Sequence, residues 1–149
     1  MRNPPDRTVA DIHPQLQADC LRVGYFPLCH LLLMKDANYP WFILVPDRAG
    51  VQEIYQLEVS DQQQLMRESV QLSLTLVTAL SPDKLNIAAL GNIVPQLHVH
   101  HVVRYRADAA WPAPVWGSAA AQPYDAAGLA SLLARLKPAL PAEFVWLAH

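Results

Sequence analysis

The chain of 149 residues has few cysteines, little net charge and no long apolar segment, and each shortage excludes a class of protein. Cys20 and Cys29 form no C-x-x-C pair and allow at most one disulfide bridge. A net charge of −2 provides no general attraction to nucleic acid or to an anionic membrane. The apolar runs are interrupted by Lys35, Pro40 or Pro46, so none spans a bilayer. We therefore expect a cytoplasmic protein that binds neither nucleic acid nor membrane.

The composition, with 52% hydrophobic and 16% charged residues, is typical of a globular protein, and the length suits one domain. The patterns predict five strands, over residues 20–25, 28–35, 41–45, 84–90 and 96–105. They predict helices over residues 13–19, from residue 60 to about residue 80, and over 125–137. We expect an α+β fold, with an antiparallel meander of about five strands, a long helix packed on it and a C-terminal helix.

The long helix has the clearest sequence signals. Ser60 and Gln63 form an S-x-x-Q capping box, and Asp61 suits the positive end of the helix dipole. The apolar residues of this segment fall on one broad arc, which identifies the helix as scaffold: Leu65, Met66, Val70, Leu72, Leu76, Val77 and Leu80.

The stretch from Gln96 to Arg104 contains three of the six histidines in the chain. Its apolar and β-branched residues predict a strand. Because side chains alternate between the faces of a strand, Gln96, His98 and His100 would share one face. His101 would lie on the other face. A buried core face rarely accepts so many polar groups without partners, so this pattern indicates a site.

The spacing of the histidines alone leaves three explanations close to even. In a metal site, His98 and His100 would share one ion. Its further ligands would come from Asp36, His30 or His13. In a structural role, the histidines would be hydrogen-bonded at an interface or a sheet edge. In nucleophilic catalysis, one imidazole attacks phosphorus while a neighbour orients it.

The same stretch resembles the histidine triad (HIT) motif, His-φ-His-φ-His-φ-φ, in which φ is apolar. His98 matches the second, catalytic histidine, and His100 matches the third. The resemblance extends to residues 84–86, to the turn over 91–95, and to an acidic turn between strands at 31–46. It covers about residues 20–105 of one expected HIT-like domain over 1–149, and a C-terminal helix and tail occupy 106–149.

The resemblance implies a HIT-like fold, a homodimer whose sheets join, and a nucleotide substrate handled without a cofactor or metal. It implies that His98 is the nucleophile, whereas His100 holds its tautomer and the phosphate oxygens. Asp36 matches the residue that accepts hydrogen bonds from ribose hydroxyls. Asn86 and Asn92 match amide positions near the phosphate. A neutral imidazole is available at neutral pH, given a reference pKa of ~6.5.

Three positions depart from the HIT pattern. Gln96 replaces the first histidine; its amide can orient a neighbour but cannot shuttle protons. Trp41 stands where many members carry a histidine, and its indole either packs against a base or fills the core. Ile93 stands where some members present a serine hydroxyl to the leaving group. Because isoleucine cannot protonate a leaving amine, we expect an anhydride such as a dinucleoside polyphosphate to be a better substrate than a phosphoramidate.

Three features near the motif receive no catalytic role. His101 either faces a dimer partner or finds a buried acceptor. We interpret Arg104 and Arg106 as solvated residues at the end of the strand. Trp111 and Trp116 lie among prolines in a rigid loop, which either forms a wall of the nucleotide pocket or covers the sheet edge.

The sequence therefore predicts a nucleoside-monophosphate hydrolase or transferase that acts on a phosphoanhydride through a nucleotidyl-histidine. The expected catalytic residues are Gln96, His98 and His100, and the expected substrate-binding residues are Asp36, Trp41, Asn86 and Asn92. Two alternatives stay open. One is a nucleotide-binding or sensing protein that has lost turnover through the changes at positions 41 and 96. The other is a metal-dependent hydrolase in which two histidines are ligands.

Overall fold

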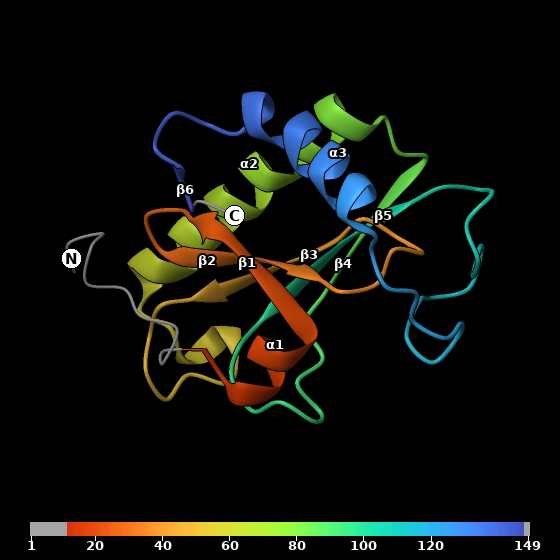
Figure 1. Cartoon of the computed structure of the whole chain (residues 1–149). Helices are drawn as coiled ribbons and strands as arrows, with labels where there is room; N and C mark the ends of the chain where they lie inside the picture. Colours follow the sequence, from red (N-terminus) through yellow and green to blue (C-terminus); the bar gives the residue numbers. More distant parts are fainter. Residues whose placement is uncertain (1–11, 148–149) are drawn as a thin grey trace.

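The computed structural model describes residues 12–147 and confirms an α+β fold on an antiparallel sheet (Figure 1). Its elements are α1 (Pro14–Asp19), β1 (Cys20–Tyr25), β2 (Cys29–Met34), β3 (Trp41–Pro46), η3 (Ile54–Gln56), α2 (Val59–Leu80), β4 (Lys84–Ala88), β5 (Val99–Arg104), α3 (Ala126–Leu136), η4 (Lys137–Ala139) and β6 (Val145–Trp146). Both cysteines are free and buried. Along residues 12–147, no helix has both the length and the apolar character that crossing a membrane requires.

The sheet has six strands in the order β4-β5-β3-β2-β1-β6, one more than predicted, because the short β6 pairs with β1. β1, β2 and β3 form the expected meander. The hairpin of β4 and β5 follows α2, and β5 pairs with β3. Ile43 lies opposite His100 in that ladder, and Trp41 lies opposite Val102. The histidine-bearing strand is therefore in the interior of the sheet.

The strand predicted over 96–105 begins only at Val99, so its predicted start is wrong. The backbone N–H of Leu97 donates to the carbonyl of Val51 over 2.9 Å. The carbonyl of Gln96 lies 2.7 Å from Nδ1 of His98. These bonds direct the backbone groups of residues 96–98 away from the ladder with β3. The strand predicted over 84–90 is also shorter and ends at Ala88.

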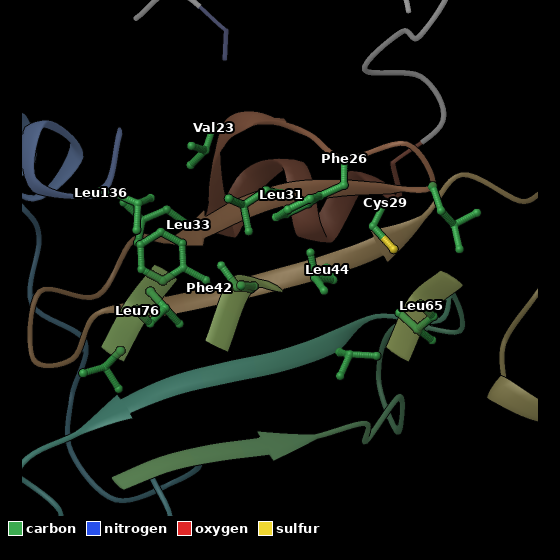
Figure 2. Packing of buried hydrophobic residues seen from close by; sticks show 14 of the residues in the cluster. Val23, Phe26, Cys29, Leu31, Leu33, Phe42, Leu44, Leu65, Leu76 and Leu136 are labelled. Carbon is green, nitrogen blue, oxygen red and sulfur yellow. The ribbon is translucent and has the colours of Figure 1, made fainter. Parts of the chain in front are cut away.

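The two faces of the sheet carry two separate apolar clusters. One face packs against α2 and α3, and Figure 2 shows side chains of this cluster, among them Leu31, Leu33, Phe42, Leu44, Leu65, Leu76 and Leu136. The other cluster joins the opposite face of the sheet to α1 and to the chain after β5, and includes Leu16, Trp41, Ile43, Val45, Val102 and Val115. Alternation along each strand thus gives the sheet two buried sides.

The helix α2 begins at Val59 and does not use the predicted capping box of Ser60 and Gln63. The preceding turn η3 leads directly into α2, and the capping box that does form joins Glu53 and Gln56 around η3. Because the helix has already begun, Ser60 lies inside its first turn. At the other end, Ser81 adopts a left-handed conformation with φ of 47° and terminates the helix.

Only part of the predicted apolar arc of α2 is buried. The inward residues are Leu65, Leu72, Leu76 and Leu80. Three residues that the sequence places on the same arc are exposed instead: Met66, Val70 and Val77. The sheet and α3 cover one side of the helix, so the flank of the arc is left at the surface.

A buried carboxylate fixes α2 to the start of β2. Glu68 is 0% exposed, and its oxygens accept hydrogen bonds from the backbone N–H groups of Leu28 (2.9 Å) and Cys29 (2.8 Å). Nε2 of Gln64 donates a third bond of 2.6 Å. The carboxylate thus satisfies two backbone donors at the start of β2 that would otherwise be buried without acceptors.

Replacing Glu68 with glutamine should lower the free energy of unfolding by about 2 kcal/mol, because an amide turns a donor toward a backbone donor. Urea denaturation at neutral pH measures this loss. The matched control is Glu58→Gln, an exposed residue at which we expect a change within about 0.5 kcal/mol. Equal losses in the two variants would show that the Glu68 carboxylate does not stabilise this connection.

Candidate functional site

His98 and His100 lie beside each other on the α1 side of the sheet. Their exposed fractions are 7% and 5%, and their ring centroids are 4.9 Å apart. His101, the next residue of β5, packs on the opposite side against α2. The two-residue alternation predicted for a strand therefore brings His98 and His100 together, although His98 precedes the first residue of β5.

The tautomer of His98 follows from its hydrogen bond to the main chain. Nδ1 of His98 lies 2.7 Å from the carbonyl oxygen of Gln96. A carbonyl oxygen only accepts, so Nδ1 carries the proton of the neutral ring. Nε2 of His98 consequently keeps its lone pair, which can attack an electrophile or accept a hydrogen bond.

A cavity of about 410 Å³ opens beside the two histidines, a volume that suits a small-molecule ligand. Its lining residues are Gln15, Leu16, Asp19, Met34, Trp41, Leu90, Gly91, Asn92, Ile93, Val94, His98, His100 and Trp116. No sequence pattern assigns the α1 residues or Met34 to this site. Their residue types carry no signal, and only the packing of α1 beside the sheet brings them to this cavity.

His100 is enclosed by two tryptophans. Nε1 of Trp41 donates to Nδ1 of His100 over 2.9 Å, and the ring centroids are 5.7 Å apart. The ring of Trp116 lies 5.2 Å from that of His100 and nearly perpendicular to it. Burial, together with the nearby His98 and His101, lowers the pKa of His100 to about 3. This ring is therefore neutral at physiological pH.

Three other predicted site residues have different surroundings. The side-chain oxygen of Gln96 accepts a 2.8 Å hydrogen bond from the backbone N–H of His13, at the start of α1. Asn92 lines the cavity. Asn86 is not among the described residues that line it, and its amide oxygen accepts a 2.7 Å hydrogen bond from Arg104.

Asp36 lies beside the cavity rather than in its lining. Its Oδ1 accepts hydrogen bonds from the backbone N–H groups of Asn38 (3.0 Å) and Gln122 (3.2 Å). A second hollow of about 320 Å³ is lined by Asp36 and shares three residues with the cavity: Asp19, Met34 and Trp41. Within residues 12–147, no group of three His, Cys, Asp or Glu side chains is arranged to hold a metal ion.

The prediction that Arg104 is solvated is wrong. Arg104 is 1% exposed, and it donates to both carboxylate oxygens of Asp108, at 2.8 and 3.1 Å. It also donates to the amide oxygen of Asn86 and to the carbonyl of Ala113. The sequence does not reveal these partners because the loop after β5 must first fold back over the strand. Arg106, by contrast, is exposed as expected.

The loop after β5 is held by Asp108 and carries the two tryptophans to different places. Burial raises the pKa of Asp108, but hydrogen bonds from Arg104 and from three backbone N–H groups lower it to about 2. Trp111 packs against Arg104, with the guanidinium carbon 5.6 Å from the centroid of the Trp111 ring. Trp116 lines the cavity. This loop therefore forms part of the wall, one of the two interpretations that the sequence allows.

His101 finds a buried acceptor and donor inside its own chain. It is 0% exposed, and its Nδ1 lies 3.1 Å from the carbonyl of Val99. The hydroxyl of Ser69 lies 2.7 Å from Nε2. Because the carbonyl requires a proton on Nδ1, the hydroxyl donates to Nε2. Burial lowers the pKa of this ring to about 4, although the bond to Val99 raises it.

Comparisons with known proteins agree with the fold and with the motif. The chain matches the HIT domain family over residues 15–107. A histidine triad protein from Marinobacter aquaeolei VT8 is 49% identical, with a TM-score of 0.83 over 87% of this chain and 94% of that chain. A histidine triad protein from Bradyrhizobium japonicum is 45% identical, with a TM-score of 0.85, and the match covers 87% of this chain and 96% of that chain. A histidine triad protein from Sinorhizobium meliloti 1021 is 38% identical, with a TM-score of 0.85, and the match covers 93% of this chain and 100% of that chain. No curated protein matches the chain.

The free energy of unfolding should fall as the pH drops from 6.5 toward 4. In this range His100 and His101 bind protons in the unfolded chain but not in the folded protein, because folding lowers the pKa of both rings. Each ring should contribute a slope of roughly 1 kcal/mol per pH unit in this window and nothing above it. Urea denaturation at a series of pH values measures the slope. His101→Gln should remove its own share of the slope; an unchanged slope would show that folded His101 binds a proton.

Proposed function

The chain belongs to the histidine triad (HIT) domain family, and on this premise we propose that it hydrolyses or transfers nucleoside monophosphate groups. The proposed substrate is a nucleotide phosphoanhydride such as a dinucleoside polyphosphate. The proposed path runs through a nucleotidyl-histidine on His98. The observation that supports it most directly is the bond from Nδ1 of His98 to the Gln96 carbonyl, which leaves the Nε2 lone pair for attack.

The reaction consists of two displacements at phosphorus. In the first, the Nε2 lone pair of His98 forms a bond to the α-phosphorus while the bond to the bridging oxygen breaks. That electron pair leaves with the phosphate group. The positive charge that develops on the ring is stabilised by the bond from Nδ1–H to the Gln96 carbonyl. In the second, a water oxygen attacks phosphorus, the N–P bond breaks to restore the imidazole, and the proton of the water passes to solvent.

The surroundings of Ile93 support an anhydride rather than a phosphoramidate. Ile93 lines the cavity with 88% of its surface exposed, and its side chain has no proton to give to a leaving group. A phosphate leaves an anhydride as a stable anion, whereas an amine leaves a phosphoramidate only when it is protonated. The residue therefore favours the substrate whose leaving group needs no acid.

The nucleoside part of the substrate is proposed to lie in the hollow beside the cavity. Asp36 lines this hollow, and the bonds from Asn38 and Gln122 occupy only its Oδ1. The carboxylate keeps acceptor capacity on Oδ2, which suits ribose hydroxyls. Asn92 lines the cavity itself and is proposed to donate to the phosphate, with Trp41 forming the wall between the two spaces.

Wild-type protein should release nucleoside monophosphate from a dinucleoside polyphosphate faster than from an adenosine phosphoramidate or a nucleotide sugar. His98→Ala should lower that release by about 1000-fold or more, because the nucleophile is lost. Chromatographic assay of the monophosphate, with and without a chelator, measures both results.

Nucleotide binding by the same His98→Ala variant is the control, because it shows that the cavity persists. Chelator-resistant release that disappears in the variant supports the nucleophilic mechanism. Binding without release by wild type would instead favour a sensing protein. Release that the chelator abolishes would favour a metal-dependent hydrolase. Faster turnover of the phosphoramidate would contradict the argument from Ile93.

We also propose that two copies of the chain associate along β4 and α2. The residues of this dimer face have exposed fractions between 49% and 64%: Met66, Val70, Leu74, Val77 and Ile87. On α2, the face lies on the side away from Gln71 and Thr75, which bond to the C-terminal segment. Several large exposed apolar residues on one face of a helix are typical of an association surface.

The edge of the sheet adjoins this face. β4 is the first strand in the sheet order, so within residues 12–147 its outer side has no partner strand. Ile87 lies opposite His101, whose side chain bonds to α2, and so shares the α2 side of the sheet. Antiparallel pairing of β4 with β4 of a second copy would continue the sheet while it buries the apolar face.

Val70→Glu should convert the dimer to a monomer, because it places a charge in an apolar interface. Sedimentation velocity at micromolar concentrations measures the association state. The matched control is Tyr55→Glu, which adds the same charge at a residue that is 78% exposed and lies outside the dimer face. A wild-type protein that sediments as a monomer, or two variants that dissociate equally, would contradict this interface.

A further inference from the structure

We infer that Trp41 is a positioning residue that holds His100 in the tautomer with its proton on Nε2. The indole would thereby make His100 a neutral hydrogen-bond donor beside the lone pair of His98. This role differs from the two that the residue type suggests, a surface for a base and a filler of the core. The catalytic part of the inference rests on the proposed function, whereas the tautomer of His100 does not.

The register of the sheet brings the two side chains together. Trp41 is the first residue of β3 and lies opposite Val102 of β5, so His100 is its diagonal neighbour on the same face. A diagonal neighbour on an antiparallel pair is about 7–8 Å away, which an indole can span. The observed contact is a 2.9 Å hydrogen bond from Nε1 of Trp41 to Nδ1 of His100.

The direction of this hydrogen bond is not ambiguous. An indole nitrogen can only donate, so Nδ1 of His100 must accept and carries no proton. The single proton of the neutral imidazole is then on Nε2. A doubly protonated ring would place an N–H of His100 against the N–H of Trp41, so the contact opposes protonation. Burial and the neighbouring histidines act in the same direction and lower the pKa of His100 to about 3.

The packing around Trp41 keeps the indole in place. Trp41 is 7% exposed, and its ring meets those of Tyr39 and Trp116 edge to face, with centroids 6.3 and 5.7 Å away. His100 also contacts Trp116, so its ring lies between two tryptophans. A side chain held on several sides keeps one rotamer, which is what a positioning role requires.

The two histidines thus present opposite chemistry to the cavity that both line. The Gln96 carbonyl puts the proton of His98 on Nδ1 and leaves a lone pair on Nε2. The Trp41 indole donates a hydrogen bond to Nδ1 of His100, so the proton of that ring is on Nε2. A nucleophile and a neutral donor for a phosphate oxygen are then set side by side.

Nitrogen NMR of the substrate-free protein, with labelled histidines, tests the tautomer directly. Wild type should show His100 with an unprotonated Nδ1 and a protonated Nε2 between pH 5 and pH 8. In Trp41→Phe, which removes the donor and keeps a ring, His100 should exchange between tautomers and bind a proton at a higher pH than in wild type. Trp116→Phe is the matched control. Trp116 also packs on His100 but donates no bond to it, so the tautomer should be unchanged.

Kinetics with the preferred anhydride then test the consequence. Trp41→Phe should lower kcat by about 10–100-fold, with an acid limb that moves to higher pH and little change in KM. Replacing Trp41 with benzothienylalanine, which keeps the indole shape and lacks only the N–H, should give the same tautomer exchange even if the phenylalanine variant is unstable.

Three results would overturn the inference: wild-type His100 with its proton on Nδ1, an unchanged tautomer in the variants at position 41, or an unchanged kcat when the tautomer is lost. Absence of turnover by wild type on every substrate would contradict the proposed function, and the NMR result would still decide the tautomer.

Discussion

The pairing of β5 with β3 is the interaction on which the rest of the site depends. It joins two strands that are separated in sequence by α2 and β4, and it places His100 opposite Ile43. A slip of one residue would exchange His100 and His101 between the faces of the sheet. Depending on its direction, the slip would bring either Val99 or His101 into the present place of His100. The buried pairs of His101 with Ser69 and of Arg104 with Asp108 would be broken by such a slip, so these contacts help to determine which side chain of β5 reaches the cavity.

Burial and hydrogen bonding together explain how three adjacent histidines tolerate the interior. A charged imidazole would lose its hydration there, whereas a neutral ring with its nitrogens paired loses much less. His98 and His101 each donate a hydrogen bond from Nδ1 to a carbonyl two residues earlier in the chain. His100 has no such bond and instead accepts from Trp41. The same local geometry that makes the rings compatible with the core also sets the nitrogen that each ring presents, so stability and chemistry have one origin here.

The sequence predicts those features that depend on neighbouring residues. Strand alternation predicts that His98 and His100 share a face, and apolar periodicity predicts the inward side of α2. Predictions that depend on distant partners are wrong or incomplete. Arg104 has its main ionic partner, Asp108, on a loop that must turn back over β5, so its burial has no local signal. The Ser60 capping box does not form because α2 begins at Val59, so Ser60 already lies within the helix. Part of the cavity wall comes from α1, which no spacing rule connects to the histidines, whereas the wall formed by Trp116 is one of the two interpretations that the sequence offers for its loop.

Gln96, which the sequence resemblance matches to the first position of the HIT motif, has two separate structural tasks. The group that sets the tautomer of His98 is the main-chain carbonyl of residue 96, which every residue type supplies. The side chain at this position is therefore free for another task, and its amide oxygen accepts a bond from the backbone of His13 at the start of α1. α1 in turn contributes a wall of the cavity. A glutamine here removes one titratable group and keeps both the acceptor for His98 and an anchor for that wall. The orientation of His98 thus does not depend on the side chain at position 96, because the bond that holds its ring comes from the main chain.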